Sequence, residues 1–251
     1  MPMRPPSTAL TRARRIVPVS ALLIAAMLAG CLPDAVTRQG GQVAGLYTLF
    51  MLAAAVVFAV VVGLMGWSIW RYRGGGPRDT ELPDQTHGNL RLESAWWVLP
   101  AILVVVLGTL TTLVLGDVDA RADEPDVVVE VTGFQWQWRF EYPESGVVVT
   151  GTAEEPPVIY LPTARTIALE ITARDVIHSF TIPAFLIKRD AVPGRDNRFD
   201  VVIEDEGTYT GQCGEFCGLL HSYQRFTIEA VSPAEFDAWL ADQQEAADGD
   251  G

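Results

Sequence analysis

The sequence predicts a membrane-anchored all-β protein, in which a hairpin of two transmembrane helices precedes an antiparallel β-sandwich or barrel with a C-terminal helix. Two stretches without any charged residue, 40–70 and 94–116, predict the two helices. The chain after residue 116 instead breaks into short runs of β-branched and aromatic residues, bounded by glycine, proline or acidic turns. Such spacing is typical of a sandwich or barrel.

Residues 1–30 have the layout of a secretory signal peptide. Basic residues precede an apolar run, which ends in L-A-G directly before Cys31. This ending resembles the bacterial lipobox, which predicts that Cys31 is lipidated and becomes the first residue of the mature protein. An uncleaved anchor helix is the alternative. Residues 31–45 are then an exported N-terminal segment.

The segments 46–70 and 94–116 are each long enough to cross a hydrocarbon layer of roughly 30 Å as a helix. Tryptophans at one end of each segment fit interfacial anchors: Trp67, Trp70, Trp96 and Trp97. The loop between the segments, 71–93, carries four arginines, whereas only Arg38 lies between Cys31 and the first segment. By the positive-inside rule, the loop is cytoplasmic and the chain after residue 116 is exported.

The exported domain, 117–244, is predicted to contain short strands and one helix. Strands are expected at 127–132, 136–142, 166–171, 176–182, 197–203, 207–212 and 223–231. The sequence S-P-A-E at 232–235 offers an N-cap, a proline at the first helical position and a capping glutamate, which predicts a helix to about Gln244. Residues 245–251 are predicted to form a disordered acidic tail.

The negative charge of the chain belongs to the exported part. Residues 117–251 hold 26 acidic and 9 basic residues, a net charge of −17, whereas the remaining residues sum to +4. A field of that sign repels nucleic acid and speeds the encounter with cationic partners. Adaptation to salt or for solubility is the alternative explanation. The sequence contains no Walker A loop and no Rossmann fingerprint.

The stretch C-G-E-F-C-G-L-L-H-S-Y-Q at 213–224 gathers two thiols and an imidazole. These ligands suit copper or zinc better than calcium or magnesium, which prefer oxygen. Three interpretations stay open on spacing alone: a disulfide between Cys213 and Cys217, a closed zinc site, or a copper site for electron transfer. If Cys31 is lipidated, the other two of the three cysteines form a pair.

Two features favour copper. The stretch lies between two predicted strands near the end of a small all-β domain, where cupredoxin-like proteins place a ligand loop. His178 lies in the strand-like run D-V-I-H-S-F and would complete a site of two thiolates and two imidazoles with His221. A core histidine without a metal is the alternative for His178.

These segments together resemble subunit II of the haem-copper cytochrome c oxidases. The runs at 175–180 and 213–221 match the family's two motifs for a dinuclear copper centre called CuA, and I-K-R-D-A-V-P-G-R-D-N at 187–197 matches the family's sequence after the first motif. The similarity extends over nearly all of the mature chain. It implies a cupredoxin-like domain behind the helix hairpin.

The resemblance implies a ligand set for two copper ions. Cys213 and Cys217 would bridge both ions, and His178 and His221 would bind one each. The backbone carbonyl of Glu215 would be a weak ligand. Its side chain would face a magnesium ion at the junction with subunit I.

Two further residues gain roles through the resemblance. The segment G-F-Q-W-Q-W-R-F-E-Y-P at 133–143 is similar to the family's aromatic segment, in which Trp136 is the electron entry point from cytochrome c. A core aromatic is the alternative. The segment 86–96 resembles the stretch that leads into the second helix, which places Glu93 at the mouth of a proton-uptake channel. Without the family, Glu93 is an acidic residue favoured by the helix dipole.

One position departs from the family pattern. Where the family has an axial methionine, this chain has Gln224. A glutamine oxygen replaces the thioether in related mononuclear copper sites, where the axial ligand tunes the reduction potential. We therefore expect copper to be retained and its potential to be lowered.

The resemblance implies a subunit of a respiratory oxidase in the bacterial cytoplasmic membrane, with the copper domain on the outer, periplasmic face. It would accept electrons from cytochrome c and pass them to haem in subunit I, where oxygen is reduced to water with proton pumping. Subunit III and membrane lipid are the other expected partners. A copper-free quinol oxidase subunit II and a membrane-tethered copper carrier are the alternatives.

Overall fold

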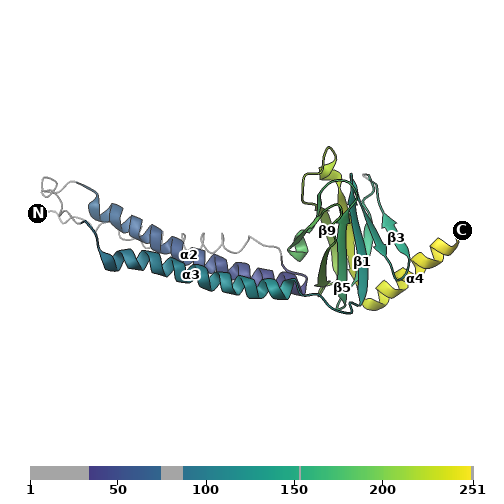
Figure 1. Ribbon diagram of the computed structural model, residues 1–251, viewed down its shortest axis with the longest axis horizontal. Helices are drawn as coiled ribbons and strands as arrows, with labels where there is room; N and C mark the ends of the chain where they lie inside the picture. The colour runs from purple at the N-terminus through teal and green to yellow at the C-terminus, as the bar shows by residue number, and fades with distance from the viewer. Residues whose placement is uncertain (1–33, 75–86, 153, 250–251) are drawn as a thin grey trace, which may run out of the picture. The chain divides into compact units, whose positions relative to one another are not determined.

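The computed structural model describes residues 34–74, 87–152 and 154–249 (Figure 1). The predicted signal peptide, Cys31 with its predicted lipid, and part of the loop 71–93 lie outside the described residues. The fold and the site consist of residues from the described ranges.

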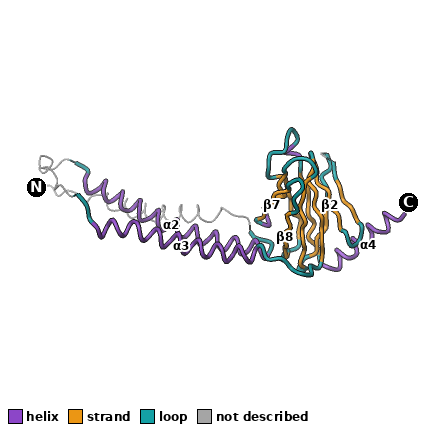
Figure 2. The backbone as a smooth tube through the Cα atoms, in the orientation of Figure 1, coloured by secondary structure: helices purple, strands orange, loops and turns teal. Residues whose placement is uncertain are grey.

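The two charge-free segments form helices α2 (Arg38–Tyr72) and α3 (Leu90–Val118), which are long and apolar enough to cross a membrane. They pack along each other (Figure 2). Both helices begin before the predicted spans, because a polar N-cap residue starts each helix in the residues that precede the apolar segment. The Thr37 hydroxyl accepts the Gly40 N–H, and the Asn89 side chain accepts from the first turn of α3. Polar caps of this kind satisfy amides that a helix start leaves unpaired.

The rest of the chain forms a two-layer β-sandwich with a C-terminal helix, as predicted (Figure 1). The first sheet has the order β3-β2-β1-β5-β8 and consists of β1 (Val127–Phe134), β2 (Gln137–Tyr142), β3 (Val147–Thr150), β5 (Thr166–Ala173) and β8 (Asn197–Val202). The second has the order β4-β10-β9-β6-β7 and consists of β4 (Val158–Pro162), β6 (His178–Ile182), β7 (Ile187–Ala191), β9 (Gly207–Cys213) and β10 (Arg225–Val231).

Strand pairing is mostly antiparallel, but each sheet contains one parallel pair. These pairs are β1 with β5 and β4 with β10. Local sequence patterns do not encode the direction of a partner strand, so the prediction of antiparallel pairing missed both.

Three strands were not predicted: β3, β4 and β7. Strand β7 has the sequence I-K-R-D-A and buries only its two end residues, so it lacks a clear apolar face. Strand β4 ends on Pro162, a residue that usually argues against a strand. Three predicted starts were also early, one of them by a single residue, since β2 begins at Gln137 rather than at 136. Strand β6 begins at His178 rather than at 176, and residue 223 belongs to the 3₁₀ turn η2 (His221–Tyr223) that precedes β10.

The helix α4 (Pro233–Gly249) covers β3 and β4. Its Trp239 stacks on Tyr160 with ring centroids 4.9 Å apart and meets Tyr142 edge-on at 5.4 Å. The predicted end at Gln244 was wrong, because the helix continues to Gly249 through residues that the sequence placed in a disordered tail. Alanine, glutamine and glutamate after residue 242 have high helix propensity and extend it.

An aromatic layer fills the interior between the sheets. The rings of Phe180 and Phe226 stack at 4.6 Å, and Trp138 meets both edge-on. All three side chains are fully buried. Gly211 leaves the space that the Phe226 ring occupies, since a Cβ there would lie 2.0 Å from the ring. This layer is the floor on which the sequence-predicted ligands rest.

Replacing Phe226 by alanine would open a cavity in this layer. We expect Phe226→Ala to lower the free energy of unfolding by about 3–5 kcal/mol. The measurement is urea unfolding of the metal-free chain in detergent, followed by tryptophan fluorescence. Phe216→Ala is the matched control, because that ring is 82% exposed, and should change the value by less than about 0.5 kcal/mol. Equal decreases in the free energy of unfolding of the two variants would contradict the stabilising role of this aromatic layer.

Candidate metal centre

Strand register brings the sequence-predicted ligands to one end of the sandwich. Cys213 of β9 lies opposite Phe180 of β6, so both side chains point to the interior, and His178, two residues before Phe180, points the same way. Gln224 precedes Phe226 by two residues and likewise points inward, and its carbonyl accepts the Cys213 N–H. These side chains form the layer above the aromatic floor.

Three buried ligand candidates lie close together. The ligand atoms of His178, Cys213 and Cys217 all lie within 4.8 Å of each other. The two sulfur atoms are 3.8 Å apart, and His178 Nδ1 is 3.9 Å from Cys213 Sγ. His221 joins through Cys217, with Nδ1 at 3.5 Å from Sγ. The Glu215 carbonyl oxygen lies 3.2 Å from Cys213 Sγ.

The sulfur separation bears on the disulfide alternative. A disulfide requires sulfur atoms about 2.05 Å apart. At 3.8 Å, Cys213 and Cys217 are free thiols in this structure. The thiols are therefore available as ligands.

The two thiols differ in acidity. Burial disfavours the thiolate of Cys213, but hydrogen bonding with His178 and backbone groups outweighs it and lowers the pKa of Cys213 to about 6. Burial, followed by the negative charge of Cys213, raises the pKa of Cys217 to about 12. The metal-free site therefore favours one thiolate, and binding a metal to both sulfurs would release a proton.

Asp175 fixes the orientation of the His178 ring. Its carboxylate lies 2.9 Å from His178 Nε2 and also accepts the N–H groups of Gln135 and Val176. Because a carboxylate only accepts, Nε2 carries the proton of this bond and Nδ1 faces the sulfur atoms. Carboxylates commonly orient metal-binding histidines in this way.

The Gln224 amide is fully buried and its orientation is determined by two backbone carbonyls. Its Nε2 donates to Phe134 O at 3.2 Å and to Gln137 O at 3.0 Å. The amide oxygen therefore points into the cluster, 2.9 Å from His178 Nδ1 and 3.0 Å from Cys217 Sγ.

The chemistry of this donor set fits a soft metal cation. The inward atoms are two sulfurs, an imidazole nitrogen, an amide oxygen and a backbone oxygen, with His221 beside them. When both thiols and His178 Nδ1 are deprotonated, every inward atom offers a lone pair to a cation. Sulfur and imidazole together favour copper or zinc over calcium or magnesium.

Comparison with known proteins shows the family of this chain. Residues 25–113 match the family model described as "Cytochrome C oxidase subunit II, transmembrane domain", and residues 153–231 match "Cytochrome C oxidase subunit II, periplasmic domain". Cytochrome c oxidase subunit 2 of Alkalihalophilus pseudofirmus is 35% identical over 240 residues, covering 91% of this chain and 68% of that protein. The corresponding protein of Cereibacter sphaeroides is 32% identical over 226 residues, covering 77% and 73%. The chain belongs to the cytochrome c oxidase subunit II family.

A solved structure is also similar to part of this family member. It is the crystal structure of the periplasmic domain of subunit II of cytochrome oxidase of Bradyrhizobium japonicum, with 29% identity and a TM-score of 0.46. The match covers 50% of this chain and 99% of that one.

The other predicted residues of this subunit II fall in different places. Trp136 is half-buried in the turn between β1 and β2, and its indole N–H donates to the Cys217 carbonyl at 3.3 Å. The Glu215 carboxylate is half-exposed and forms an ion pair with Lys188. Glu93 lies in the first turn of α3, where its carboxylate accepts the Asn89 N–H and caps the helix.

Two residues that hold the ligands were missed by the sequence analysis, Asp175 and Gln135. Asp175 precedes His178 by three residues in the run that carried the resemblance, so its spacing was a usable signal. Gln135 contacts Cys217, which is 82 positions away, and no local pattern points to that contact.

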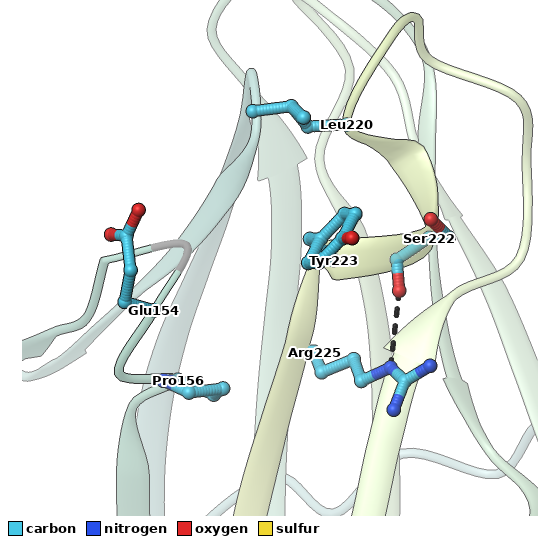
Figure 3. A pocket seen from close by; sticks show the side chains of 6 residues that line it. All are labelled: Glu154, Pro156, Leu220, Ser222, Tyr223 and Arg225. Carbon is cyan, nitrogen blue, oxygen red and sulfur yellow. Dashed lines mark hydrogen bonds between the residues drawn. The ribbon is translucent and has the colours of Figure 1, made fainter.

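A pocket of about 850 Å³ opens beside η2, the turn that carries His221 (Figure 3). Its lining residues are Glu154, Pro156, Leu220, Ser222, Tyr223 and Arg225. Arg225 Nε donates to the Ser222 carbonyl at 3.1 Å, which braces the turn. None of the ligand candidates lines this pocket, so it is separate from the buried cluster.

The orientation of the Gln224 amide leads to a stability prediction. Gln224→Glu preserves size but removes both amide N–H donors, so the Phe134 and Gln137 carbonyls lose this partner and face a buried carboxyl group. We expect the free energy of unfolding of the metal-free chain to fall by about 1–3 kcal/mol. Gln212→Glu, at an exposed position of β9, is the control in the same urea titration and should change little. A Gln224→Glu chain as stable as the control would show that the amide donors contribute nothing.

Proposed function

We propose that this subunit II accepts electrons from cytochrome c at a dinuclear copper centre and passes them to haem in subunit I, where oxygen is reduced to water with proton pumping. The observation that carries the proposal is the convergence of two thiols, two imidazoles and two oxygen acceptors, with the Nε2 proton of His178 and the amide protons of Gln224 pointing away from the cluster. Copper bound here would supply reversible one-electron transfer.

Four residues would hold the copper ions: His178, Cys213, Cys217 and His221. The two thiols lie between the imidazoles, so each sulfur is in reach of both sides of the site. Glu215 would add its carbonyl and Gln224 its amide oxygen as weak donors. The ligands other than His221 are anchored by strands, by Asp175 and by backbone bonds, which limits their movement when the charge of the site changes.

The surface of the loop fits contact with partner proteins. Phe216 and Leu219 are 82% and 87% exposed beside the buried ligands, where a second protein could cover them. Trp136 would be the electron entry point, and the acidic exported domain would steer a cationic cytochrome c towards it. Subunits I and III would be the membrane partners.

Three further roles rest on the family alone. At the junction with subunit I, Glu215 would exchange its ion pair with Lys188 for a magnesium ion. Glu93 would lie at the mouth of a proton-uptake channel while capping α3. Cys31 would be lipidated, with the copper domain on the periplasmic face of the bacterial cytoplasmic membrane.

Metal analysis tests the proposal directly. The purified full chain, loaded with copper in detergent, should hold two copper ions and absorb in the near infrared. Cys213→Ser should lose the band and at least one copper ion, because one of the two sulfurs is gone. Ser222→Ala, on the exposed face of η2, should keep both. A single copper or a zinc ion in the unaltered chain, or a disulfide that persists after loading, would contradict the proposal.

The amide oxygen of Gln224 should influence the reduction potential. A soft thioether favours reduced copper more than a carbonyl oxygen does, so Gln224→Met should raise the potential. The measurement is a redox titration of the copper-loaded chain, with Gln212→Met as the exposed control. An unchanged potential together with an unchanged spectrum would show that Gln224 does not act on the metal.

A further inference from the structure

We propose that Gln135 is a positioning residue for electron entry, whose side-chain amide holds the Cys217 carbonyl against Trp136. Gln135 itself touches no proposed copper ligand atom. It would act by fixing the distance between the tryptophan and the backbone of a ligand residue. This inference rests on the proposed function.

Two neighbouring residues donate to one oxygen. Gln135 Nε2 lies 2.7 Å from the Cys217 carbonyl oxygen, and Trp136 Nε1 lies 3.3 Å from the same atom. The glutamine bond is at the short end of the range for N–H···O bonds, whereas the indole bond is slightly longer than that range. The glutamine therefore anchors the carbonyl, and the weaker indole contact depends on that anchor.

The backbone at residue 218 passes so close to the two donor nitrogens of Gln135 and Trp136 that glycine is required there. At Gly218, directly after Cys217, a Cβ would lie 3.1 Å from both Gln135 Nε2 and Trp136 Nε1. The backbone there has a φ of +123°, which side chains with a Cβ rarely adopt. A larger residue at this position would occupy the space that the two donors use.

Gln135 is also held from the opposite side. Its backbone N–H donates to Asp175 Oδ2 at 2.7 Å, and the other oxygen of that carboxylate orients His178. The turn that carries Trp136 is thus attached to the surroundings of His178 through the main chain of Gln135. It is attached to Cys217 through the side chain.

This arrangement gives a continuous route between the tryptophan and the sulfur. The route runs from the indole N–H across one hydrogen bond to the Cys217 carbonyl, and then through covalent bonds to Sγ. Hydrogen bonds carry electronic coupling only while they are short, so the coupling depends on how firmly the carbonyl is held. Without Gln135, the long indole bond alone would hold the two segments together.

The test uses the assembled oxidase with reduced cytochrome c in a rapid-mixing experiment that follows the copper absorbance. Gln135→Ala should slow electron entry by about three- to tenfold, the change in equilibrium that the loss of one such hydrogen bond produces. Copper content and reduction potential should stay unchanged, since no ligand atom is altered. If Gln135 only stabilised the fold, its loss would change the reduction potential and the entry rate together. A slower entry rate at an unchanged potential therefore points to positioning.

Two variants complete the design. Gln244→Ala removes the same kind of bond, from a glutamine amide to the Ser145 carbonyl, on the surface of the domain and should leave the entry rate unchanged. Gln135→Asn keeps an amide that is one methylene too short and should slow entry like alanine. If Gln135→Ala loses its copper, the entry rate of Gln135→Asn tests the inference instead.

Unchanged entry in a Gln135 variant that retains copper, or an entry rate that falls only together with the potential, would overturn the inference. Failure of the unaltered chain to bind copper would instead overturn the proposed function. The two failures are therefore distinguishable.

Discussion

The site depends on one constraint, which is that the polar groups around the cluster direct their protons outward. Asp175 accepts a hydrogen bond from Nε2 of His178, and the Phe134 and Gln137 carbonyls accept hydrogen bonds from the side-chain amide of Gln224. The atoms that face one another inside the cluster offer lone pairs, which repel one another unless protons or a cation lie between them. The fold must therefore supply enough stability elsewhere to keep these atoms together.

That stability comes from the aromatic layer directly below. Phe180 lies two residues after His178 and Phe226 two residues after Gln224, so the alternation of a strand places ring and polar side chain on the same inward face. Gly211 gives the Phe226 ring its space, and Trp138 closes the layer beneath His178. The geometry of the cluster is thus set by strand register, while the loop 214–223 only has to return the chain with Cys217 and His221.

The sequence predicted the parts whose signals are local. The charge-free segments predicted α2 and α3, and the dense run of Cys and His predicted side chains that lie close together in the structure. It did not predict the parallel pairing of β1 with β5, because that depends on contacts between distant segments. The contacts of Gln135 were hidden for the same reason. The helical end of α4 was missed because its acidic composition was interpreted as disorder.

The side chain of Gln224 has a structural role besides that of a candidate ligand. Its oxygen belongs to the cluster, but its two N–H groups belong to the turn between β1 and β2, which carries Trp136. A methionine at this position would offer sulfur to a metal and nothing to the turn. Compared with methionine, the glutamine lacks a soft sulfur donor but adds two hydrogen bonds between the end of the ligand loop and the turn that carries the proposed entry site. Together with the side chain of Gln135 on the other side of the same turn, it ties the position of Trp136 to the candidate metal centre.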